Sequence, residues 1–121
     1  MILSVALPQM NPDMQSAIVE ALYGVEGRLL PPGSKLIDLK VDLSLAVAHD
    51  CPPVTYHRIA LRDRAWLRRV LVRRGEEIPV GAPLLILSSE PDEDPDAPAE
   101  RAARTSVAGI MPQTDWWGME G

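Results

Sequence analysis

Glycine and proline recur along this chain so closely that few segments could form an ordinary helix. The 121 residues include 8 glycines and 12 prolines, which punctuate short apolar stretches. In the clearest stretch, polar Asp38, Lys40 and Asp42 alternate with apolar neighbours, as in a strand with one buried face. Residues 17–23 fit a helix or a strand by periodicity, and the glycines after them favour a strand. We expect strands at residues 2–7, 36–41, 54–61, 66–72 and 84–87. The sequence therefore predicts an all-β fold, a sandwich or a barrel.

The spacing of the turns is repeated within the chain. Gly27 and Gly33 lie six residues apart, as do Gly75 and Gly81, and each second glycine precedes a leucine by three residues. Apolar stretches flank both copies. We therefore expect pseudo-two-fold symmetry, with residues 36–41 and 84–87 in equivalent places.

Composition narrows the class of protein. No apolar run approaches the ~20 residues of a membrane span, and the first residues lack the basic region of a signal peptide. Cys51 is the single cysteine, so no internal disulfide can form. We expect a cytoplasmic protein. The net charge is −5, so nucleic-acid binding is disfavoured overall. Because the excess of acids lies in residues 88–121, the isoelectric point says little about the partners of the domain before them.

The composition changes after residue 88, which predicts a β domain over 1–88 and a linker with a tail over 89–121. Residues 90–96 are acidic and proline-rich, as in a linker. Residues 97–105 could form a short helix capped by Asp96. Trp116 and Trp117 then follow in a polar segment. Exposed large aromatic side chains commonly anchor on an apolar surface, so we expect this pair to dock, on a partner protein, on a second copy or back on the domain.

Several motifs together resemble one family. They are residues 7–14 (LPQMNPDM), the glycine turns, the strand that ends at Asp42 and the stretch 66–72. The set resembles the lipoyl domain of 2-oxo acid dehydrogenase acyltransferases, and the related biotinyl carrier domains. The resemblance covers residues 1–87 and implies a flattened β-barrel or sandwich, the hybrid motif, with pseudo-two-fold symmetry.

The chain departs from that family at the residue that would carry the prosthetic group. In lipoyl domains the residue after the hairpin aspartate is the lysine that carries lipoate, and here Asp42 is followed by Leu43. Leucine has no amine to acylate. The interval from Asp42 to Ala65 is also about twice the family's usual length, which implies an insertion over about 44–64.

Two functions follow from the resemblance. The first is a non-enzymatic interaction or accessory subunit of an acyl-transfer or 2-oxo acid dehydrogenase-type complex, without lipoate or biotin. The second is a working lipoyl or biotinyl carrier modified on a displaced lysine, Lys40, although modifying enzymes recognise a protruding turn and Lys40 is expected within a strand.

Catalytic and metal-binding chemistry finds little support in the sequence. His49, Cys51 and His57 are the best metal-ligand candidates, but their spacing matches no established site. The His-then-Asp-Gly signature of the acyltransferase core is absent. We therefore expect no metal and no catalytic residue.

Overall fold

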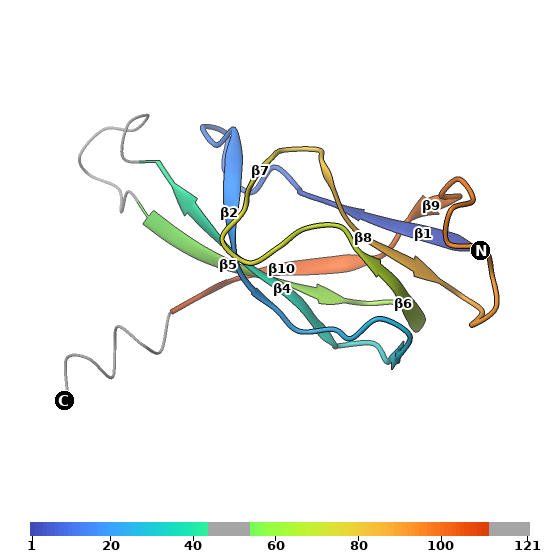
Figure 1. Cartoon of the computed structure of the whole chain (residues 1–121). Coiled ribbons are helices and arrows are strands. Elements are labelled where there is room, and N and C mark those ends of the chain that lie inside the picture. Colours follow the sequence, from blue (N-terminus) through green and yellow to red (C-terminus); the bar gives the residue numbers. More distant parts are fainter. Residues whose placement is uncertain (44–53, 112–121) are drawn as a thin grey trace.

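The computed structural model describes residues 1–43 and 54–111, which form ten strands in two five-stranded sheets (Figure 1). One sheet has the order β3-β6-β8-β1-β9 and the other β10-β5-β4-β2-β7. The strands are β1 (Ile2–Ala6), β2 (Ser16–Leu22), β3 (Leu29–Leu30), β4 (Lys35–Asp42), β5 (Val54–Leu61), β6 (Ala65–Val70), β7 (Glu77–Pro79), β8 (Pro83–Ser88), β9 (Arg101–Ala102) and β10 (Thr105–Ile110).

The predicted all-β class is confirmed, and the two sheets do not close into a barrel. The ambiguous segment 17–23 lies mostly in β2, and the segment 66–72 mostly in β6. Because the described residues contain no helix, none of them forms a helix that could cross a membrane.

The repeat seen in the sequence corresponds to a repeat in strand order. If β1 is matched with β5, β2 with β6, β3 with β7 and β4 with β8, the order β3-β6-β8-β1 becomes β7-β2-β4-β5. This is the order of the other sheet without β10, read from its opposite end. The match therefore includes all of the first eight strands. The expected equivalence of residues 36–41 and 84–87 is met, because β4 and β8 are the middle strands of their sheets.

Hydrogen bonds show the same relation between residues 48 positions apart. The Gly27 N–H donates to the Leu67 carbonyl at 2.7 Å, and the Gly75 N–H donates to the Val19 carbonyl at 2.7 Å. All four glycines of the repeat have φ between 88° and 93°, a region that residues with a Cβ rarely adopt. Other equivalent bonds join Tyr23 to Leu36 and Leu71 to Leu84, and Ser34 to Pro31 and Ala82 to Pro79.

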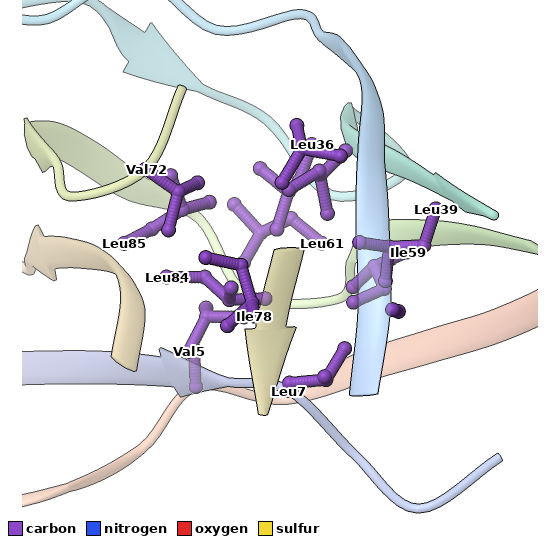
Figure 2. Packing of buried hydrophobic residues seen from close by; sticks show 14 of the residues in the cluster. Val5, Leu7, Leu36, Leu39, Ile59, Leu61, Val72, Ile78, Leu84 and Leu85 are labelled. Atoms are coloured by element: carbon purple, nitrogen blue, oxygen red, sulfur yellow. The ribbon is translucent and has the colours of Figure 1, made fainter. Parts of the chain in front are cut away.

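The core lies between the sheets and is aliphatic, as a chain without phenylalanine requires. Labelled side chains from strands of both sheets gather there in Figure 2, among them Leu39, Ile59 and Leu85. The core accounts for the alternation in β4, where Ile37, Leu39 and Val41 are fully buried.

The expected division at residue 88 does not coincide with the end of the sheets. The segment 101–110 forms β9, which runs parallel to β1, and β10, which pairs with β5 from Thr105↔Leu61 to Ile110↔Tyr56. The short helix expected over 97–105 is wrong, because the backbone there bonds to other strands: the Glu100 and Ala103 N–H groups donate to the carbonyls of Ile2 and Ser4. Partners far along the chain thus outweigh the local capping signal.

The acidic segment before β9 lies against arginines of β6. Arg69 forms an ion pair with Asp96 at 2.8 Å, and the Arg68 guanidinium donates to the Glu93 carbonyl at 2.5 Å and to the Ser88 hydroxyl at 3.2 Å. The segment 90–96, which the sequence suggested to be a linker, therefore contacts β6.

One carboxylate fixes the connection between β9 and β10. Asp63, in the β5–β6 turn, accepts hydrogen bonds from the Arg101 guanidinium at 3.0 Å and from the Arg104 N–H at 2.8 Å. These two donors, Arg101 first, hold the pKa of Asp63 below its ordinary value.

We expect Asp63→Asn to lower the melting temperature at pH 7, by an amount that corresponds to about 1 kcal/mol, since the pair is partly exposed. A carboxylate with a depressed folded pKa stabilises fully above its unfolded pKa and loses that contribution as pH falls through the folded value. The difference from wild type should therefore shrink towards pH 3 and below. Asp13→Asn, in an exposed turn, controls for the lost charge. A difference that is constant between pH 7 and pH 2.5 would contradict the assignment.

Candidate functional site at the end of the β4–β5 pair

The resemblance to lipoyl domains points to the end of the β4–β5 pair. The pairing of these strands ends at Asp42↔Val54, and Leu43 is the last described residue before residue 54. Asp42 is exposed, whereas Leu43 is 6% exposed and belongs to the hydrophobic core. The position that would carry the prosthetic group therefore faces inward.

The segment expected to be an insertion, about 44–64, contains a regular strand of the fold. Residues 54–61 form β5, which pairs with β4 on one side and with β10 on the other. The residues between Leu43 and β5, 44–53, lie outside the described residues.

The alternative attachment residue, Lys40, lies inside the sheet. It is opposite Ile18 of β2 and Tyr56 of β5, and its side chain is partly buried. A lysine with a strand on each side is a poor substrate for an enzyme that recognises a protruding turn.

An open apolar cavity of about 540 Å³ lies beside this end of the sheet. Its polar contact is a 3.0 Å hydrogen bond between the Thr55 hydroxyl and the His57 Nε2 atom. Burial lowers the pKa of His57, which favours the neutral imidazole at pH 7. The cavity is suited to an apolar side chain or chain segment. Its lining residues are Val54, Thr55, Tyr56, His57, Gly109, Ile110 and Met111.

The sequence analysis missed a polar cluster that joins β4, β5 and the residue after β2. The Arg58 guanidinium donates to both oxygens of Asp38, at 2.8 and 3.1 Å, and the Tyr23 hydroxyl donates to the same carboxylate. Asp38 is 7% exposed. The hydrogen bond to Asp38 raises the pKa of Tyr23, and Asp38 also raises that of Arg58.

The cluster acts as a structural pairing. Each of the three residues hydrogen-bonds to the other two, and Arg58 and Lys35 also lie over the Tyr23 ring. The signal available in the sequence was Asp38 on the polar face of a strand. Its partner depends on the β4–β5 register Asp38↔Arg58, which a single sequence does not specify.

The remaining candidates are separated or lie outside the described residues. His57 lies in β5, and residues 1–43 and 54–111 contain no group of three His, Cys, Asp or Glu side chains that could hold a metal ion. His49, Cys51, Trp116 and Trp117 lie outside the described residues.

Comparison with known proteins adds no family. No protein-family model matches the chain, and no curated protein matches it.

We expect Arg58→Met to lower the free energy of unfolding by about 2 kcal/mol, because it leaves the buried Asp38 carboxylate without its cation. Arg69→Met is the matched control: its ion pair is exposed on both sides, at 46% and 71%, and its loss should cost no more than about 0.5 kcal/mol. Chemical denaturation of both variants measures the two values. The double variant Asp38→Leu/Arg58→Met should recover part of the lost free energy of unfolding. Equal losses for Arg58→Met and Arg69→Met would contradict the structural role of the cluster.

Proposed function

We propose that this chain is a non-enzymatic, lipoyl-like interaction or accessory subunit of an acyl-transfer or 2-oxo acid dehydrogenase-type complex, and that it carries neither lipoate nor biotin. The observation that carries the proposal is the burial of Leu43 in the core at the attachment position. An attachment residue must leave the protein surface to visit other active sites. A core leucine holds this end of the sheet in place.

The fold supports the kinship on which the proposal rests. The sheet orders and the equivalent hydrogen bonds of the two halves agree with the pseudo-two-fold arrangement that the resemblance implies. The alternative, a carrier modified on Lys40, needs that lysine to reach a ligase from the middle of a sheet.

An interaction subunit also needs a surface that suits a partner. The cavity between the start of β5 and the end of β10 supplies an apolar one, bordered by Met111, which is 80% exposed. Burying a large apolar side chain there would contribute on the order of 2 kcal/mol.

Intact mass after co-expression with a lipoate ligase or a biotin ligase tests the proposal. We expect no mass increment on the wild type, and none on Leu43→Lys, which should also lower the melting temperature because a buried ammonium is poorly solvated. Leu43→Met conserves volume and should cost less than about 1.5 kcal/mol. A lipoyl or biotinyl increment on the wild type, removed by Lys40→Arg, would establish the carrier function instead.

The tryptophan pair provides a second test, since we propose that Trp116 and Trp117 dock onto a partner subunit. Deleting residues 112–121 leaves β10 whole, and Trp116→Ala/Trp117→Ala keeps the chain length. We expect both variants to lose binding to purified dehydrogenase and acyltransferase subunits in a titration, with the melting temperature unchanged. A clear drop in the melting temperature of both variants would mean that the tail belongs to the domain.

A further inference from the structure

β10 forms one end of its sheet, and its outer side has no paired strand in the described part of the chain. All six of its residues pair with β5, and no other strand within residues 1–43 and 54–111 pairs with it. The other strands at the ends of the sheets, β3, β7 and β9, have only two or three residues. In the described part of the chain, β10 is therefore the one long end strand (Figure 1).

The hydrogen-bond pattern determines which backbone groups point away from β5. The Arg62 N–H donates to the Arg104 carbonyl at 2.7 Å, so in this antiparallel ladder residues 104, 106, 108 and 110 bond to β5. Residues 105, 107 and 109 then direct their N–H and carbonyl groups outward. Leu61 agrees with this assignment: it lies opposite Thr105, and its N–H donates to the Ser34 carbonyl on the other side of β5.

β10 lacks the features that usually prevent an end strand from pairing with another strand. Natural end strands are commonly protected by charged residues, proline or a bulge. The sequence of β10, TSVAGI, contains neither charge nor proline, and its pairing with β5 runs without a register shift. Val107 is 41% exposed. A second strand can therefore add to this side at little cost in desolvation.

We propose that β10 pairs antiparallel with β10 of a second copy of this chain, which joins two five-stranded sheets into one continuous ten-stranded sheet. The charge of β10 and of the residues before it favours a second copy as the partner and an antiparallel direction for the pair. A neutral strand opposes a copy of itself without repulsion, and it offers no attraction to a charged peptide. Arg104 directly precedes β10, so antiparallel pairing separates the Arg104 cations of the two copies by roughly 20 Å, whereas parallel pairing would bring them together.

The contact is a two-fold interface in which each copy contributes the same surface. A six-residue strand pair is small beside the roughly 1,200–2,000 Å² of a standard interface, so the dimer should be weak and should depend on concentration. The inference does not depend on the lipoyl-like kinship, since intact mass tests that function and self-association tests this surface.

Sedimentation equilibrium of the full chain from about 1 μM to about 300 μM should show a monomer–dimer equilibrium. Val107→Lys places like charges near the two-fold axis and should raise the dissociation constant at least about tenfold. Val107→Thr, which keeps a β-branched side chain, should leave it within about threefold. A wild type that is monomeric up to the highest concentration would overturn the proposal.

A pair of proline variants separates the two sides of β10. Val107→Pro removes an outward N–H and should give a folded monomer, since proline is tolerated where the N–H faces solvent. Ala108→Pro removes an N–H that bonds to β5 and should lower the melting temperature. If both variants dimerise as the wild type does, the outward side of β10 is not the interface.

Amide hydrogen exchange by NMR tests whether part of the same chain already covers this side. We expect Ser106 and Ala108 to be protected at every concentration, and Val107 and Gly109 only where the dimer is populated. Slow exchange of Val107 and Gly109 in the dilute monomer would mean that another segment of the same chain pairs with β10, and would overturn the proposal.

Discussion

The hydrophobic core shared by β4 and β8, the middle strands of the two sheets, is the feature on which the rest of the structure depends. Residues 48 positions apart occupy equivalent places in the two middle strands, and all are at most 2% exposed: Leu36 and Leu84, Ile37 and Leu85, Leu39 and Leu87. Complete burial of one such side chain contributes about 1.5–3 kcal/mol. The six together are comparable with the whole net stability of a small domain, so a sheet that lost its middle strand would not persist.

This central packing also explains the character of the candidate site. The buried series of β4 continues through Val41 to Leu43, beyond the end of the strand. A side chain at that position contributes to the core, and a lysine there would have to leave the core to be useful. The burial of Leu43 therefore supports the proposal that no prosthetic group is attached at this position. The interaction function proposed above would use a surface such as the apolar cavity between the start of β5 and the end of β10.

The sequence predicted those parts of the fold that depend on local rules. The glycine spacing predicted the repeat, because residues with φ near 90° are almost always glycine, and the alternation in residues 37–43 predicted β4. The parts it missed depend on partners far along the chain. The segment 97–105 has the local signals of a helix, but its backbone groups find partners in β1. Asp38 was recognised as polar, whereas its pairing with Arg58 requires the register between two strands, which no local signal in this chain specifies.

The last two strands alter the surface that the pseudo-symmetric part of the molecule presents. Without them, the equivalent strands β1 and β5 would each stand at the end of a sheet. One segment of chain covers both, since β9 pairs with β1 and β10 pairs with β5. The two additions differ in length: β9 matches two residues of β1, whereas β10 pairs along six residues of β5. The charged strand β5, with Arg58 at its centre, thereby becomes internal, and a neutral strand takes the end of the sheet. Symmetry in the core therefore coexists with asymmetry at the ends of the sheets, and the asymmetric end is where this fold can accept another strand.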